Sequence, residues 1–145
     1  MDSFENSDIK ANISFAKVLG KIGIPAISHL VEFYHQSNDP CKESYALYAL
    51  GKTMEIVVGK DLSTARRNEI FNLLFGCIAD VHSTIRAKAI RALCKMDKGR
   101  LLTDVQRSQL STACRRITGQ DENYQWDRAF IVRKEAQGAL ILFGT

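Results

Sequence analysis

Four segments of the chain share one pattern of apolar and small residues. The segments are residues 11–21, 42–52, 85–95 and 132–142. They align without gaps when Leu19, Leu50, Leu93 and Leu140 are superimposed. Small or apolar residues then recur one and four positions before each leucine, which is the spacing of one face of an α-helix. The leucines are 31, 43 and 47 residues apart, which is the range of helical repeats.

An amphipathic segment precedes each of the last three copies. These segments begin at Pro25, at about Arg66 and at Asp104, and the last one runs to Ile117. Proline is favoured at the first position of a helix because its missing N–H has no helical partner there. The pattern therefore predicts three further helices, each paired with the repeated segment that follows it.

Two short motifs mark helix starts. Thr103 and Gln106 have the spacing of a capping box, in which each side chain bonds the backbone N–H of the other residue. Asp39 stands directly before Pro40, which is typical of an N-cap followed by the first helical residue. No segment shows strand alternation bounded by hairpin turns. We therefore expect seven helices in a single all-α domain over residues 1–145.

The repeated segments resemble the HEAT-repeat family, including its short type once named after phycobilisome lyases. In that family the second helix of a repeat typically reads Asp-x-x-Val-Arg-x-x-Ala-x-x-Ala-Leu-Gly. The matching residues are Ile85, Arg86, Ala89, Ala92 and Leu93 in the third copy, and Val132, Arg133, Ala136, Ala139 and Leu140 in the fourth. The second copy has Lys42-Glu43, and the first has Ala11-Asn12, where the family has Val-Arg.

The resemblance covers residues 8–144 and implies a right-handed α-α superhelix, or solenoid, of about three and a half HEAT-like helical pairs. Within it, the repeated segments would line the concave side, and Arg86 and Arg133 would bond carboxylates or carbonyls at the junctions between repeats. Such solenoids are mostly interaction scaffolds. The resemblance thus implies a non-catalytic protein-binding scaffold or adaptor.

The charge is unevenly distributed along the chain. The total is +4, but residues 1–60 carry −1 and residues 61–145 carry +5. A basic half suits an acidic partner, although +5 over 85 residues is also compatible with an ordinary surface. We expect a protein partner with an acidic surface or segment, and nucleic acid is the alternative partner.

Positions two and five before the marker leucine, and two after it, are expected on the concave surface. The basic and aromatic residues at these positions are Tyr45 and the seven that we predict to bind a partner, namely Lys17, Lys21, Tyr48, Lys52, Lys88, Arg91 and Lys95. Their alignment on three successive helices predicts a partner-binding row, against the simpler interpretation of a solvated helix face. The long loop 119–128 adds Tyr124 and Trp126, the chain's single tryptophan. The interpretation that we prefer for Trp126 is docking on the helix ends, and the alternative is a partner anchor.

Motifs for cofactors and metals are weak. Gly51-Lys52-Thr53 lies inside a predicted helix and lacks the glycine-rich loop that cradles phosphates. His29 and His35 are about 120° apart around a helix, which makes them poor co-ligands. The four cysteines contain no CxxC pair and stand in helix-patterned apolar stretches, where we expect small buried hydrophobes. We predict no cofactor and no metal.

Catalysis is the least favoured interpretation. A glycosylase-like enzyme would use an acid such as Asp127, but that residue is better placed as a cap for a helix over 129–143. A bilin lyase shares the repeats, and nothing in the sequence marks a bilin site.

The sequence also bears on location and assembly. The acidic, polar N-terminus and the reduced cysteines favour the cytoplasm, and no apolar run is long enough to span a membrane. The apolar end of the last helix, at Leu142 and Phe143, predicts either self-association or packing against the preceding loop.

Overall fold

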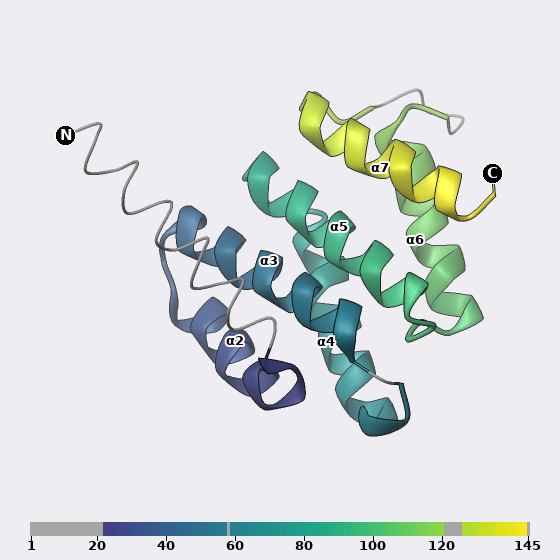
Figure 1. Cartoon of the computed structure of the whole chain (residues 1–145). Coiled ribbons are helices and arrows are strands. Elements are labelled where there is room, and N and C mark those ends of the chain that lie inside the picture. The colour runs from purple at the N-terminus through teal and green to yellow at the C-terminus, as the bar shows by residue number, and fades with distance from the viewer. Residues whose placement is uncertain (1–21, 58, 121–125, 145) are drawn as a thin grey trace.

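A computed structural model describes residues 22–57, 59–120 and 126–144 of the chain (Figure 1). These residues form six α-helices and one short 3₁₀ turn at Gly59–Asp61, and they contain no strand. The helices are α2 (Ile24–Gln36), α3 (Pro40–Ile56), α4 (Thr64–Cys77), α5 (Ser83–Lys98), α6 (Asp104–Ile117) and α7 (Phe130–Leu142). The prediction of an all-α chain is confirmed for this part of the sequence, and the predicted helix at 11–21 lies outside the described residues.

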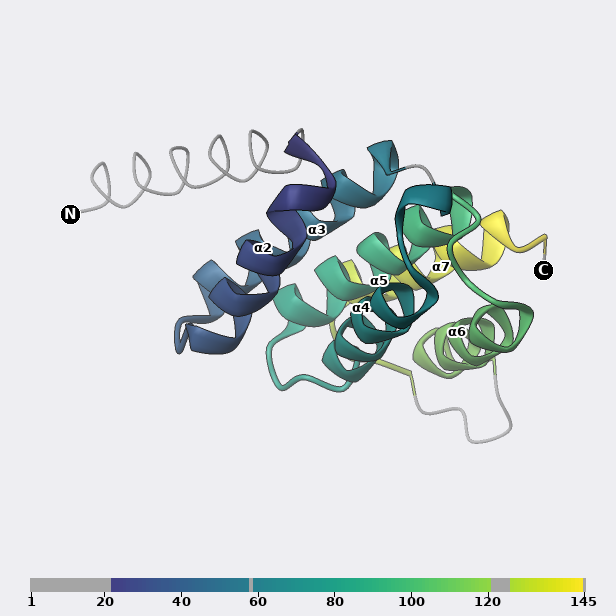
Figure 2. The same ribbon diagram turned by 90° about the horizontal axis from the view of Figure 1, so that it is seen from below.

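The helices form two layers. Helices α3, α5 and α7 lie side by side, with α5 between the other two (Figure 1). Helices α2, α4 and α6 form the second layer, where each packs on the following helix of the first layer (Figure 2). The apolar face of each helical pair is therefore buried partly within the pair and partly against the neighbouring pairs, because a single pair cannot bury all of its apolar surface.

The repeated apolar positions form the core. Leu50, Leu93 and Leu140 are at most 4% exposed. The small residues one and four positions before each of them are also buried, namely Ala46, Ala49, Ala89, Ala92, Ala136 and Ala139. The alignment of the last three copies therefore identifies the buried face of each helix. Alanines at these positions let neighbouring helices approach closely while adding little side-chain entropy to the cost of folding.

The helix starts follow local signals in the sequence. The capping box at Thr103 and Gln106 is present, and the Asp39 carboxylate accepts the N–H of Cys41 at 3.0 Å. Helix α2 begins one residue before Pro25, so the proline lies in its first turn. Helix α4 begins at Thr64, two residues earlier than predicted, because the Ser63 hydroxyl caps it by accepting the N–H of Arg66.

Arg86 joins the second and third helical pairs. Its guanidinium donates two hydrogen bonds to the Asp127 carboxylate, at 2.8 and 2.9 Å, and further bonds to the carbonyls of Asp80 and Val81. Arg133 donates to the Asp127 carbonyl at 2.7 Å. Both arginines therefore bond carboxylate or carbonyl groups at a junction between helical pairs, as predicted.

Asp127 is the carboxylate at the centre of this junction. Burial opposes its ionisation, but hydrogen bonds from Arg86 and from the N–H of Ala129 outweigh that effect and lower the pKa of the carboxyl. The prediction of Asp127 as the cap of a helix over 129–143 needs correction. Helix α7 begins at Phe130, and Asp127 bonds the N–H of the N-cap residue Ala129 instead of occupying the N-cap position. Asp127 stands two residues before this N-cap, at a position from which its carboxylate also reaches Arg86.

We expect Arg86→Ala to lower the free energy of unfolding by about 2–4 kcal/mol, because it leaves the largely buried Asp127 carboxylate without its partner. Urea unfolding at neutral pH measures the loss. The control is Arg66→Ala, which breaks a more exposed pair with Glu69 and costs about 1 kcal/mol or less. Equal losses in the two variants would contradict a structural role that is special to Arg86.

The same junction predicts a pH dependence. Because the folded-state pKa of Asp127 is lowered, its contribution to stability is present above the ordinary aspartate pKa of about 3.9 and is lost as the pH falls through the folded value. The deficit of Asp127→Asn relative to the parent chain should therefore shrink in acid. A deficit that stays constant from neutral to acid pH in urea titrations would show that the carboxylate's charge is not involved.

Candidate partner-binding surface

The structure brings together the five described members of the predicted row. Tyr48 and Lys52 lie on α3, and Lys88, Arg91 and Lys95 lie on the adjacent helix α5. We call these five residues the basic face. Lys17, Lys21 and Tyr124 lie outside the described residues.

Tyr48 lies at the centre of the basic face. The ammonium groups of Lys88, Lys52 and Lys95 are 5.2, 5.7 and 6.0 Å from the centroid of its ring. Cations at this distance interact with the electron-rich face of an aromatic ring. The tyrosine thereby holds three like charges together, which would otherwise repel one another at this spacing.

Lys95 differs from its predicted role as an exposed cation. It is only 8% exposed, and its ammonium is 2.7 Å from a carboxylate oxygen of Glu55. Burial lowers the pKa of Lys95 despite the opposing effect of Glu55. The hydrogen bond from Lys95 is the main reason why the pKa of Glu55 is lowered. Lys95 is therefore a packed member of the α3–α5 contact, with its charge already paired.

Glu55 is the residue that the sequence reasoning missed. It also lies 3.6 Å from the ammonium of Lys52, three residues earlier on α3. An acid three residues after a lysine is a recognisable helix pair, so the signal was present in the sequence. The second contact, to Lys95 on α5, depends on how the two helices pack.

Lys88 and Arg91 are the two cations of the basic face that form no ion pair among the described residues. Lys88 is half-buried, and burial, followed by the charge of Arg91, lowers its pKa. Arg91 is exposed. The two residues are three positions apart on α5, so their side chains project from the same side of the helix.

A hollow of about 580 Å³ extends the basic face toward α7. Arg91, Lys95 and Lys98 of α5 line one side of this hollow, and residues of α7 line the other. The α7 residues include Glu135, Gly138 and Leu142, which the alignment assigns to the same surface. These three residues stand five and two positions before Leu140 and two after it, and they border the same hollow as Arg91 and Lys95. Glu135 brings a carboxylate to the α7 side of Arg91.

Two glycines on this surface have opposite surroundings. A Cβ added to Gly51 would meet the Cα and Cβ of Ala92, each at 3.4 Å, and the Lys95 side chain at the same distance. A Cβ added to Gly138 would meet nothing within 4 Å. The absence of a side chain at Gly51 thus allows α3 and α5 to approach closely, whereas Gly138 leaves open space in the hollow.

Trp126 docks on the helix ends only in part: its side chain lies beside Gly119, just after α6, where an added Cβ would be 3.9 Å from an indole carbon. Its side chain is on the surface, at 61% exposed, and the guanidinium of Arg133 lies 5.0 Å from its ring centroid. Arg133 also approaches the exposed ring of Phe130.

The cysteines divide into two groups. Cys77 and Cys114 are buried and Cys94 is half-buried, as expected of small hydrophobes, and burial raises the pKa of Cys94 and of Cys114 to about 12. Cys41 is exposed, which contradicts the prediction, because it stands in the first turn of α3 on the solvent side.

The end of α7 is partly covered. Phe143 packs against the core, with the guanidinium of Arg107 5.3 Å from its ring, whereas Ile141 is 78% exposed. Self-association through this helix stays a prediction.

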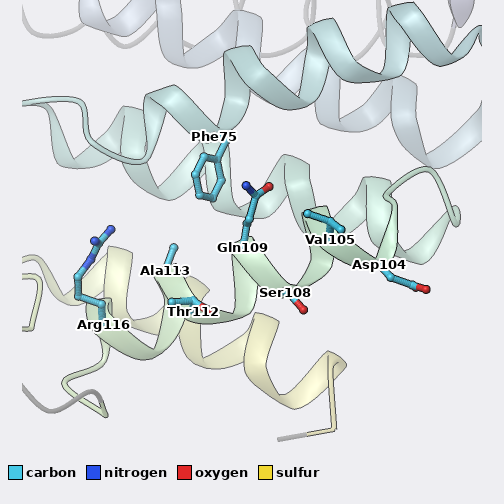
Figure 3. A pocket seen from close by; sticks show the side chains of 8 residues that line it. All are labelled: Phe75, Asp104, Val105, Ser108, Gln109, Thr112, Ala113 and Arg116. Carbon is cyan, nitrogen blue, oxygen red and sulfur yellow. The ribbon is translucent and has the colours of Figure 1, made fainter.

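A second hollow, of about 600 Å³, lies in the other layer. Phe75 of α4 and Val105 and Ala113 of α6 form its apolar part, with Asp104 and Arg116 near its two ends (Figure 3). This hollow lies outside the predicted row. Its two charged residues, Asp104 and Arg116, have opposite signs and so do not form a basic patch.

Metal binding and membrane insertion find no support in the described ranges. Within residues 22–57, 59–120 and 126–144, no group of three His, Cys, Asp or Glu side chains is placed to hold a metal ion. No helix of these ranges has the length and apolar character that crossing a membrane requires.

Comparisons of the chain with protein-family models, with curated proteins and with solved structures found no match.

We expect iodide to quench the fluorescence of Trp126 about as strongly as that of a free tryptophan derivative, because the ring is exposed and the nearby Arg133 attracts anions. Trp126 is the single tryptophan, so the signal comes from it alone. A blue-shifted emission with negligible quenching would support docking instead.

The two glycines give a matched pair of stability predictions. Gly138→Ala should raise the free energy of unfolding by up to about 1 kcal/mol, because alanine favours the helix and meets no obstacle. Gly51→Leu should lower it by about 1–3 kcal/mol through overpacking against Ala92. Thermal and urea unfolding measure both changes. Equal tolerance of leucine at positions 51 and 138 would contradict the close approach of α3 and α5.

Proposed function

We propose that this chain is a non-catalytic, protein-binding module of the cytoplasm, built as a right-handed solenoid of HEAT-like helical pairs. Its basic face binds an acidic segment of a partner protein. The observation that carries this proposal is the arrangement around Tyr48, where three ammonium groups lie within 6.0 Å of the ring centroid.

The solenoid interpretation is supported by the equivalence of successive helical pairs. Leu50, Leu93 and Leu140 occupy equivalent buried positions in α3, α5 and α7, and each of these helices packs on the helix before it. In such an array the side chains at equivalent solvent-facing positions form rows across the helices. The basic face is one of these rows.

Several features favour binding over catalysis. Tyrosine and arginine are enriched in protein interfaces because they combine a large contact area with hydrogen-bonding groups. Asp127, the acid that a glycosylase-like enzyme would need, is held by Arg86 in a two-bond ion pair at a helix junction. The residues of the basic face come from two rigid helices, which hold them in place before a partner arrives.

The charge of the surface suits a protein partner better than nucleic acid. Beside the four cations of the basic face stand two carboxylates, Glu55 on α3 and Glu135 on α7. A nucleic-acid strand carries a phosphate at every nucleotide, about 3.4 Å apart along the axis of a duplex, so it would bring several phosphates close to these carboxylates. A protein segment can place its acids beside Lys88 and Arg91 and neutral residues elsewhere.

The test uses a fluorescein-labelled peptide with two adjacent glutamates flanked by alanine and glycine, and a single-stranded DNA for comparison. Lys88→Glu with Arg91→Glu should weaken peptide binding about tenfold or more, because two attractive charges become repulsive. The matched control is Arg115→Glu with Arg116→Glu on α6, which makes the same change of net charge on the other layer. Fluorescence anisotropy measures the affinity, and thermal unfolding verifies that each variant is folded.

The outcomes separate the proposals. A large loss in the α5 variant with a small loss in the α6 variant supports the basic face. Equal losses would show that only net charge matters, and no binding of the peptide by the parent chain would overturn the proposed function. Tighter binding of DNA with a steep salt dependence would favour the nucleic-acid alternative.

A further inference from the structure

We propose that the basic face recognises one phosphorylated side chain of its partner, with the phosphate bound by Lys88 and Arg91 beside the ring of Tyr48. This inference rests on the proposed function and states which acidic group the surface selects. The observation that supports it is the position of two carboxylates, Glu55 and Glu135, beside the cations of the basic face. The packing of α3, α5 and α7 places them there.

The charges on the basic face are unequally available. Glu55 contacts both Lys95, at 2.7 Å, and Lys52, at 3.6 Å, so these two lysines already share one carboxylate. Lys88 and Arg91 form no such pair among the described residues. The positive potential available to a ligand is therefore concentrated at these two residues and not spread over the whole row.

The carboxylates limit how far an anionic ligand can extend. From Lys88 and Arg91, a ligand that continues along α5 reaches Lys95 and its partner Glu55. A ligand that continues across to α7 reaches Glu135, whose charge already acts on Lys88. A run of acidic side chains that extends toward Glu55 or toward Glu135 would meet repulsion. A compact group with the same total charge avoids it.

A phosphate monoester has this form. It carries about two negative charges at pH 7 on three oxygens attached to one atom. Lys88 and Arg91 are three residues apart on one helix, with about 5–6 Å between their Cβ atoms, so both can reach the same phosphate. The guanidinium of Arg91 can donate two parallel hydrogen bonds to it. The half-buried position of Lys88 also strengthens its attraction to a dianion, because solvent screens it less.

Tyr48 supplies the remaining part of the site. Its ring holds the Lys88 ammonium at 5.2 Å from the centroid, which orients the lysine before a ligand binds. The backbone of α3 beside it cannot move away freely, because Gly51 is packed against Ala92. Tyr48, Lys88, Arg91 and Lys95 close together over the contact of α3 and α5 and leave no room there for even a water molecule, so the phosphate would bind on the surface above them.

The experiment compares two nine-residue alanine–glycine peptides of equal charge at pH 7.5. One carries a central phosphoserine and the other carries two adjacent glutamates. Binding is followed by NMR, through the amide resonances of the full chain, and inorganic phosphate is titrated separately. We expect the phosphoserine peptide to bind at least about fivefold more tightly, with the largest shifts at Lys88 and Arg91.

Four variants define the site. Lys88→Gln and Arg91→Gln should each remove the preference for phosphoserine, and Arg91→Lys should restore part of the affinity by keeping the charge without the paired hydrogen bonds. Glu135→Gln should improve binding of the two-glutamate peptide more than that of the phosphoserine peptide, because it removes the repulsion that an extended ligand meets. Arg115→Gln with Arg116→Gln is the control and should leave the preference unchanged.

The outcomes distinguish this inference from the proposed function. Equal affinities for the two peptides, with binding of the two-glutamate peptide still dependent on Lys88 and Arg91, would overturn the phosphate preference alone. A preference for phosphoserine that persists in both Gln variants would also overturn it. Failure of all the acidic peptides to bind would overturn both proposals.

Discussion

The close contact between α3 and α5 is the constraint on which the rest of this structure depends. Gly51 has no side chain, and the position of its missing Cβ is 3.4 Å from the Cα of Ala92. Because the two helices approach so closely, Lys95 is buried beside Glu55 and the ammonium groups of α5 reach the Tyr48 ring of α3. A larger residue at position 51 would separate these groups and remove both contacts. The basic face is thus a product of core packing as much as of surface composition.

Burial and charge act against each other on this surface. Taking lysines out of water disfavours their charged form, and the pKa values of Lys88 and Lys95 are accordingly lowered. For Lys95 the ion pair with Glu55 offsets part of this cost of burial. Lys88 has no ion pair among the described residues, and its charge is attracted by the Tyr48 ring and, electrostatically, by Glu135. The cation without its own carboxylate is therefore the one that gains most from an external anion. The Arg86–Asp127 pair shows the other solution, in which a largely buried cation and anion satisfy each other and join two helical pairs.

Local patterns in the sequence predicted the fold well where a helix depends on its own residues. Leu50, Leu93 and Leu140 and the alanines before them are buried, the capping box at Thr103 is present, and α6 has the predicted bounds. Helix α4 starts two residues earlier than predicted because Ser63 caps it, and α7 starts one residue later, with Ala129 as its N-cap. The membership of the basic face was also predicted, since residues at equivalent positions of stacked helices must share a surface.

The sequence by itself determined the helical periodicity, the buried stripe of each helix and the cations that face away from it, because these properties depend on residues within about four positions of one another. Only the tertiary structure decided which of the cations are available. Glu55 pairs with Lys95 across two helices, Glu135 approaches from α7, and Arg86 bonds Asp127, which is 41 residues away in the sequence. Such contacts depend on the distance and rotation between neighbouring helices, which the local pattern of a single helix does not contain.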